Sequence, residues 1–319
     1  KVETVFDLVD AIINPGRLRA LTAARISFFA SELRRNRQDG EQVRHGLAES
    51  SIKAYLAHLK AALRWAARTG LLAAAPTFPK ITRAKDSKGS TPMKGRPITT
   101  EEFERMLGKV PVIVGDARPT EWCRLLSGLW WSGLRLGEAM ALSWDAGTIT
   151  VDLDDDDEPV FVIPPEAQKN HKLQLVPMAP EFADELLNVP VEERVGLVFN
   201  PAALDGSGRR ASQSRACRTI ADIGEAAGVK VHFEPRTQHV KFASAHDLRR
   251  AFGERWAARV TTPMLQQMMR HETVTTTLRF YAGRNAKAVA RAARAAYKAL
   301  PSNTSGNTAH FGDAANSRK

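Results

Sequence analysis

The feature that most constrains the fold is a basic segment rich in proline and glycine at residues 79–97 (PKITRAKDSKGSTPMKGRP). Such a segment sustains neither a helical nor a strand period. A chain of 319 residues is expected to form two domains, at about 150 residues each. We therefore expect a helical domain over residues 1–78, a basic linker over 79–97 and a second domain over 98–300. The linker suits either a solvated tether or a segment lying along a phosphate backbone.

The charge of the chain points to a polyanionic partner. The net charge is +11 and the isoelectric point about 9.9. Residues 1–98 carry a net charge of +10, and the rest of the chain carries +1. Nucleic acid is the usual partner of such a basic region.

Other classes of protein are disfavoured by the composition. Cys123 and Cys217 are the two cysteines, too few for a disulfide framework and without the spacing of a zinc site. A reducing, cytoplasmic setting is expected. No apolar run approaches the roughly 20 residues of a membrane span, and no secretory leader is visible.

The hydrophobic pattern predicts a mainly helical protein. Residues 1–75 show helical spacing throughout, and residues 98–300 show it over most of their length. Thr99 and Glu102 form a candidate capping box. Expected helices in the second domain cover 121–131, 181–188, 211–228, 245–259, 262–270 and 285–299. The polar tail, residues 301–319, is expected to be disordered.

Three short β-branched segments in the second domain predict a small antiparallel sheet. They cover residues 148–153, 159–164 and 173–178, and each is bounded by turn residues. The acidic run at 154–158 falls between the first two, where a solvated hairpin turn is the expected role. It lacks the glycine and spaced ligands of a calcium loop.

Several residues of the second domain suit phosphate chemistry, although each also has a purely structural interpretation. Arg135 follows the end of an apolar helix and is otherwise explained by pairing with Glu138. Lys169 lies at a hairpin turn, where lysines are usually only solvated. His246 and Arg249 share one helical face in AHDLRRAFGERW (245–256), which is either a solvated basic face or the cradle of an anion. His271 at a helix end suits capping, and Tyr281 suits a core position.

Taken in this order, these residues resemble the tyrosine recombinase (phage integrase) family. The matching segments are SGLRLGEAMAL, QKNHKLQLVP, HDLRR and RHETVTTTLRFY, within residues 95–300. The N-terminal helices and the linker resemble the core-binding domain and hinge of that family. The resemblance implies a two-domain architecture, mainly α with a small antiparallel sheet in the catalytic domain.

The resemblance also implies a role for each catalytic residue. Arg135 and Arg249 would clamp one scissile phosphate, since guanidinium groups give permanently charged, bidentate contacts. Tyr281 would attack phosphorus and form a 3′-phosphotyrosyl link. Lys169 would protonate the leaving 5′-oxygen, His246 would assist proton transfer, and His271 would position the phosphate. No metal or other cofactor is expected.

The sequence departs from the family pattern near the nucleophile. Ser132 stands where threonine is commoner, and Arg270 precedes His271 where glycine is frequent. Tyr281 is ten residues after His271, one more than the commonest spacing, so Phe280 occupies the usual position. Tyr297, in an alanine-rich segment, is the competing nucleophile.

Basic residues outside the catalytic set are expected to contact DNA, mainly at phosphates. They are Lys53, Lys60, Arg64, Lys80, Arg83, Lys85, Arg209, Arg210, Arg215, Arg218 and Arg250. The segment 285–300 resembles the C-terminal helix that family members dock onto a neighbouring protomer, or else packs on its own domain.

The resulting hypothesis is a site-specific DNA recombinase that cuts and rejoins strands without metal or ATP. The expected partners are double-stranded DNA, further copies forming a homotetramer on paired sites (monomer or dimer off DNA), and accessory DNA-bending factors. The alternatives are a catalytically silent DNA-binding relative and a type IB topoisomerase-like enzyme. A metal-dependent nuclease is disfavoured because no clustered carboxylates flank the basic motifs.

Overall fold

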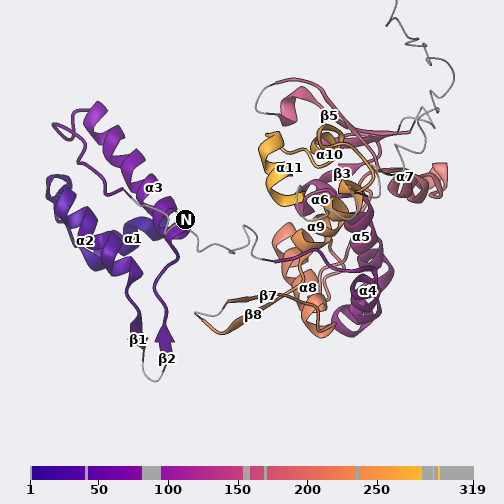
Figure 1. Ribbon diagram of the computed structural model, residues 1–319, viewed down its shortest axis with the longest axis horizontal. Helices are drawn as coiled ribbons and strands as arrows, with labels where there is room; N and C mark the ends of the chain where they lie inside the picture. The colour runs from indigo at the N-terminus through magenta and orange to yellow at the C-terminus, as the bar shows by residue number, and fades with distance from the viewer. Residues whose placement is uncertain are drawn as a thin grey trace, which may run out of the picture. The chain divides into compact units, whose positions relative to one another are not determined.

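The chain divides into two compact units, residues Lys1–Thr91 and Pro92–Lys319 (Figure 1). The computed structural model describes residues 2–39, 42–80, 95–153, 159–168, 171–234 and 237–281, together with residues 290 and 294. The boundary at 91/92 falls inside the segment expected to be a linker, most of which lies outside the described residues. The acidic run, the tail from Pro301 and nearly all of the expected helix at 285–299 also lie outside them.

The first unit is built on three helices: α1 (Val2–Ile12), α2 (Ala23–Arg34) and α3 (Glu49–Arg68). Their apolar faces form one core that includes Val5, Phe29, Ile52 and Leu59. The expectation of helix throughout residues 1–75 was wrong for one segment. Two short strands, β1 (Arg37–Asp39) and β2 (Gln42–Arg44), pair there as an antiparallel hairpin. Five of their six residues are polar, and a glycine at position 40, the first of the two residues between the paired Asp39 and Gln42, was the overlooked indication.

Four longer helices form the frame of the second unit, and two pairings dominate. α5 (Pro119–Ser132) packs on α9 (Ala245–Ala257), and α4 (Thr100–Val114) packs on α8 (Gln213–Ala226). A continuous apolar core joins them, with Trp122, Leu125, Ile220 and Leu248 fully buried. The predicted capping box at the start of α4 is present.

The sheet of the second unit has the order β3-β4-β5-β6. Its strands are β3 (Leu142–Ser143), β4 (Ile149–Asp152), β5 (Val160–Ile163) and β6 (Gln174–Pro177). The last three are antiparallel, as the β-branched segments predicted, whereas the two-residue β3 adds a parallel edge to β4. A second hairpin, β7 (Lys230–Glu234) and β8 (His239–Phe242), was not predicted. Its alternation is weak, because His232 and Lys241 lie opposite each other where apolar residues were sought.

Shorter helices complete the second unit. They are α6 (Leu136–Ala141), α7 (Pro180–Leu187), α10 (Thr262–Met268) and α11 (Val274–Tyr281). Of these, α6 and α7 pack on α5, and α10 and α11 pack on α9. α6 and α11 were not predicted, since six and eight residues are too few to display a clear helical period. Within the described residues, no helix is long and apolar enough to span a membrane.

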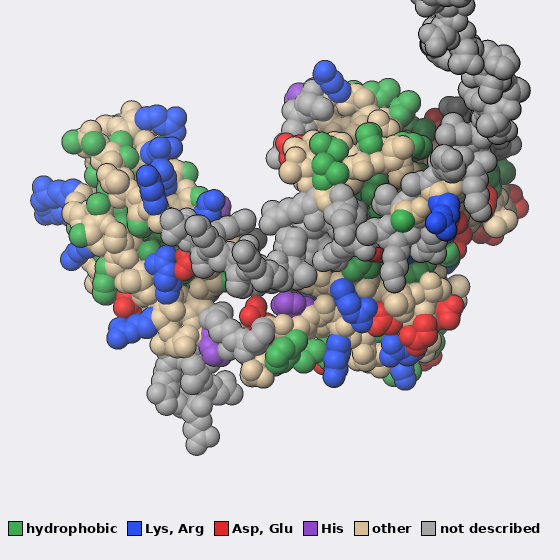
Figure 2. All heavy atoms as spheres, viewed as in Figure 1, with side chains coloured by type: hydrophobic (Ala, Val, Ile, Leu, Met, Phe, Trp, Pro, Cys, Tyr) green, Lys and Arg blue, Asp and Glu red, His purple; other side chains and the backbone are tan. Residues whose placement is uncertain are grey.

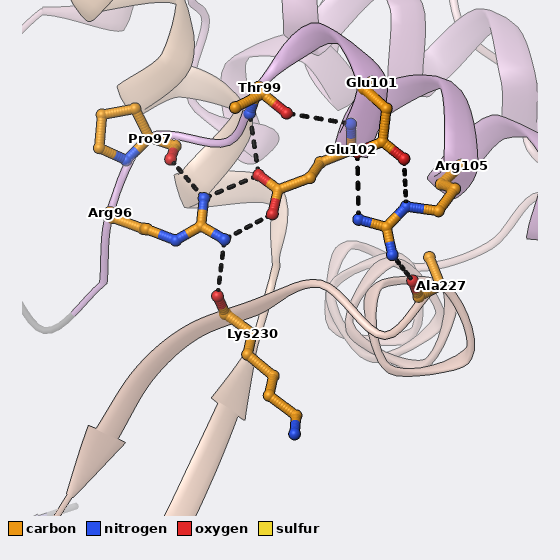
Figure 3. A network of polar contacts seen from close by, with 8 residues as sticks. All are labelled: Arg96, Pro97, Thr99, Glu101, Glu102, Arg105, Ala227 and Lys230. Carbon is orange, nitrogen blue, oxygen red and sulfur yellow. Dashed lines mark hydrogen bonds and ion pairs between the residues drawn. The ribbon is translucent and has the colours of Figure 1, made fainter.

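A polar network joins the chain entering the second unit to its first helix and its second hairpin (Figure 3). The Arg96 guanidinium donates to both oxygens of Glu102, at 2.7 and 2.5 Å, and to the carbonyl of Lys230 at 2.9 Å. The Arg96 hydrogen bond is the main cause that lowers the pKa of Glu102. The start of α4, the entering segment and β7 are thereby held together.

Candidate active site

The site is built around the end of α5, where Gly133 turns the chain. Gly133 has φ +65, and a Cβ there would lie 2.3 Å from Cδ1 of Phe252 on α9. Only glycine combines this left-handed backbone with so close an approach. The turn places Arg135 directly before α6, two residues after Gly133.

Glu138 holds Arg135 from the first turn of α6. One Glu138 oxygen, Oε2, accepts from the backbone N–H of Arg135 at 2.8 Å, and Oε1 accepts from its Nη1, also at 2.8 Å. The Arg135 side chain remains half exposed, and its Nη2 donates to the carbonyl of Arg270 at 3.4 Å. The pairing offered as a structural explanation of Arg135 is therefore present, and it orients the guanidinium of a side chain that stays half exposed.

Arg249 is buried, with 3% of its surface exposed. Its Nη1 donates to the carbonyl of Gly133, at the end of α5, and its Nη2 donates to that of Met269, at the end of α10. Hydrogen bonds to two carbonyls offset part of the cost of burying the charge. The guanidinium connects α5, α9 and α10, and thereby brings the segments carrying Arg135 and His271 to the start of α9.

The start of α9 is fixed by Asp247, which is fully buried. Its Oδ2 accepts from Ser244 Oγ at 2.7 Å, from the Ser244 N–H at 3.1 Å and from Lys241 Nζ at 3.3 Å. Arg250 donates to Oδ1. Arg250, predicted to contact DNA, is thus 9% exposed and engaged with a carboxylate. The basic face inferred for this helix is not a solvated one, because both arginines are buried.

The two histidines lie near the buried arginine. His271 Nδ1 is 2.9 Å from Oγ1 of the buried Thr277, which orients the ring. Desolvation, then the charges of Arg249, Arg135 and His246, lower the pKa of His271 from 6.5 to about 4. Desolvation, followed by Arg250 and Arg249, lowers the pKa of His246 to about 4 as well, although the side chain is partly exposed. Both rings are therefore neutral at pH 7 and able to accept a proton.

The other two predicted catalytic residues are not placed. Lys169 lies outside the described residues, between β5 and β6 in the sequence. Its neighbours Gln168 and Lys172 line an open cavity together with Arg270 and His271. α11 ends at Tyr281, whose side chain also lies outside what the structure describes.

Sequence reasoning gave no site role to two residues of this cluster: Glu138 was named only as a structural partner of Arg135, and Arg270 only as a departure from the family pattern. Arg270 Nη1 donates to Glu138 Oε1 at 2.9 Å. Burial raises the pKa of Glu138, but its bonds to Arg135 and the charge of Arg270 outweigh this, so the pKa is lowered overall. The Arg-x-x-Glu spacing was visible, whereas the contact with Arg270, 132 residues away, has no local indication. Among the described residues, no three His, Cys, Asp or Glu side chains gather as a metal site would require.

A family model described as the phage integrase family matches residues 98–288, which is more than half of the chain. The chain belongs to the phage integrase family. This agrees with the order of Arg135, His246, Arg249 and His271 along the sequence and with the helical fold around them.

Solved integrases share the fold of this phage integrase family member. A lambda integrase dimer bound to a COC′ core site aligns with TM-score 0.58 and 14% identity, over 89% of this chain and 88% of that one. A lambda integrase tetramer bound to a Holliday junction gives 0.55 and 14%, over 88% and 72%. The Tn1549 transposon integrase in complex with transposon right end DNA gives 0.53 and 19%, over 88% and 86%. Comparison with curated proteins finds no match.

The expected DNA-contacting residues of this integrase-family chain differ in their surroundings. Figure 2 shows several Lys and Arg side chains at the surface of the first unit. Exposed positions are Lys53, Arg64, Lys80, Arg209, Arg215 and Arg218, whereas Lys60 is half-buried over the ring of Phe78. Arg83 and Lys85 lie outside the described residues. Arg210 donates to the carbonyls of Phe199 and Met140, which gives it a structural task within the second unit.

Proposed function

We propose that this protein is a DNA recombinase that cleaves and rejoins strands through a covalent tyrosine link. The observation that carries the proposal is the position of Arg249, whose bonds to the Gly133 and Met269 carbonyls gather Arg135, His246 and His271 around one place. Two guanidinium groups and two neutral imidazoles suit a single phosphodiester. Arginine binds its non-bridging oxygens, and imidazole accepts or donates a proton.

In the proposed reaction, Tyr281 Oη attacks the scissile phosphorus and loses its proton to His246. The bond from phosphorus to the 5′-oxygen breaks, and Lys169 protonates that oxygen as it leaves. The product is a 3′-phosphotyrosyl link and a free 5′-hydroxyl. Attack by another 5′-hydroxyl reverses these steps, so strands are rejoined with the phosphodiester energy kept in the link and without ATP.

Charge stabilisation is assigned to the arginines. The trigonal-bipyramidal transition state carries more charge on its non-bridging oxygens than the ground state, and preorganised donors stabilise that charge. Arg249 is preorganised by the two carbonyls and Arg135 by Glu138. The proposed mechanism assigns no step to a metal ion.

Double-stranded DNA is the proposed partner, and a tetramer on two paired sites is the proposed assembly. The lambda integrase dimer on a core site and the tetramer on a Holliday junction support this assignment. The first unit, with its exposed basic side chains, would supply additional contacts to the same DNA.

The proposal is tested by trapping the covalent link. DNA selected from a random duplex library by binding to the protein is nicked at successive positions, so that cleavage releases a short fragment and cannot be reversed. Incubation in EDTA and a denaturing gel should show a protein–DNA band in the wild type and none in Tyr281→Phe. A protein that binds the selected DNA but yields no band at any nick position would instead be a silent DNA-binding relative.

A further inference from the structure

Arg270 is an arginine in a place that suits glycine. It lies between α10 and α11, directly before His271, and its φ is +46. A left-handed backbone is unfavourable for an L-residue, and glycine would avoid that cost. The side chain is also largely buried, at 18% exposure, and burial lowers its pKa. An arginine that bears both costs is expected to provide something that glycine cannot.

The Arg270 side chain supplies a second cation to one carboxylate oxygen. Glu138 Oε1 accepts from Arg270 Nη1 at 2.9 Å and from Arg135 Nη1 at 2.8 Å. Glu138 is mostly buried, so these charges interact with little screening by water. With Arg135 alone, the carboxylate would form a neutral pair and compete with a phosphate for the same guanidinium. With both arginines, the cluster keeps one net positive charge.

We propose that Arg270 is a positioning residue that neutralises Glu138, so that Glu138 can orient Arg135 without cancelling its attraction for a phosphate. This inference rests on the proposed function, in which Arg135 binds the scissile phosphate. Two features support an indirect role rather than direct contact with DNA. Nη1 of Arg270 donates to Glu138 Oε1, the same oxygen that accepts from Arg135, and the Arg270 side chain is 18% exposed, against 50% for Arg135.

The test uses variants that separate charge from backbone strain. Arg270→Gly removes the charge and suits the left-handed backbone, so the variant is expected to fold. Arg270→Lys restores the charge. Arg118→Gly is the matched control, because Arg118 is an exposed arginine at φ +51, before α5. Glu138→Gln removes the charge that Arg270 is proposed to neutralise, alone and combined with Arg270→Gly.

Two measurements are made on the full chain. The first is the rate at which the covalent link forms on the nicked duplex. We expect Arg270→Gly to slow it about ten-fold with an unchanged or higher Tm, Arg270→Lys to recover most of the rate, and Arg118→Gly to match the wild type. In the Glu138→Gln background, Arg270→Gly should slow formation of the covalent link by less than about two-fold. The second is the rise in Tm when inorganic phosphate replaces chloride at constant ionic strength, which should be smaller in Arg270→Gly.

The outcomes distinguish this proposal from the proposed function. If Arg270→Gly slows the reaction as much in the Glu138→Gln background as in the wild type, Arg270 acts on DNA directly and the proposal is overturned. A wild-type rate in Arg270→Gly overturns it as well. If the wild-type protein never forms the link, the proposed function fails. The change in Tm with phosphate then tests the role of Arg270 by itself. An equal rise in Tm for wild type and Arg270→Gly, or no rise in either, overturns the role of Arg270.

Discussion

At the residue scale, burial and then the arginines of the site lower the pKa of the two histidines and keep them neutral. Arg249 is common to both, since its charge contributes to the lowered pKa of His246 and of His271. A neutral imidazole is the form that can take the proton of a tyrosine hydroxyl. The same charges attract the phosphate, so phosphate binding and proton acceptance are linked through one buried guanidinium.

The histidines provide a prediction about pH. With pKa values of about 4, below the unfolded value of 6.5, both rings bind protons more readily in the unfolded chain. The contribution of these two histidines to the free energy of unfolding is therefore fully present above pH 6.5 and is lost as the pH drops from 6.5 toward 4. Imidazole NMR signals should titrate near pH 4 in the free protein and at higher pH with bound DNA, whose phosphates favour the charged ring. Assignment uses His246→Gln and His271→Gln, and titration of both rings near 6.5 in the free protein would refute the account.

The segment between β5 and β6 contains two lysines that can be compared. Lys169 is the proposed general acid, and Lys172 lines the cavity beside His271. Lys169→Ala should slow cleavage of an ordinary phosphodiester by about 10²-fold or more, the usual contribution of a general acid. A bridging 5′-phosphorothiolate, whose sulfur leaves without a proton, should restore most of that rate. If Lys172→Ala shows the larger loss and the same rescue, the assignment of Lys169 is wrong.

At the element scale, the residues that place the site lie at the ends of helices. The α5 end supplies the Gly133 carbonyl, the α10 end supplies that of Met269, and the α9 start is capped by Asp247. Helix ends were largely predictable where the helical spacing of apolar residues begins at a capping residue, as at Thr99, or stops at a glycine, as at Gly133. The order Arg135, His246, Arg249, His271 was readable as well.

Contacts between distant segments were not predictable from the sequence. Arg270 meets Glu138, and Arg249 meets Gly133, through packing of helices that no local pattern specifies. The same reason explains Arg210, which looks like a DNA-contacting residue in sequence but reaches the Met140 carbonyl in the fold. The β7–β8 hairpin was missed because its alternation of polar and apolar residues is weak.

Gly133 provides the prediction at this scale. Gly133→Ala adds left-handed strain and an overlap with Phe252, and should lower the free energy of unfolding by about 2–4 kcal/mol. Gly228→Ala is the control, with a similar φ of +66 and only the Arg105 guanidinium within 4 Å, at 3.9 Å. It should cost about 1–2 kcal/mol. Urea denaturation measures both, and equal losses would show that the approach to Phe252 does not matter.

At the scale of the whole molecule, the excess of positive charge lies in residues 1–98, but the nearly neutral second unit also carries exposed arginines. The exposed Arg215 and Arg218 lie one turn apart on α8, where they are free of the structural bonds that occupy Arg210. Binding through phosphates releases counterions, so affinity depends steeply on salt. Exposed and structural arginines should therefore differ in how their loss changes that dependence.

The prediction compares Arg215→Ala with Arg218→Ala, singly and together, against Arg210→Ala. Each exposed arginine should reduce the slope of log affinity against log salt by about 0.9, measured by fluorescence anisotropy with a labelled duplex. Arg210→Ala should leave the slope nearly unchanged and lower the Tm instead. If Arg210→Ala reduces the slope and leaves the Tm unchanged, Arg210 contacts DNA, as the sequence predicted.

The most direct test of the central claim is to identify the residue that carries the DNA. The trapped complex is digested with nuclease and trypsin, and the nucleotide-bearing peptide is sequenced by mass spectrometry. The account predicts the peptide Phe280–Arg284 with the nucleotide on Tyr281, although Phe280 occupies the usual position of the nucleophile. A nucleotide on Tyr297, or on any residue other than Tyr281, would contradict the account.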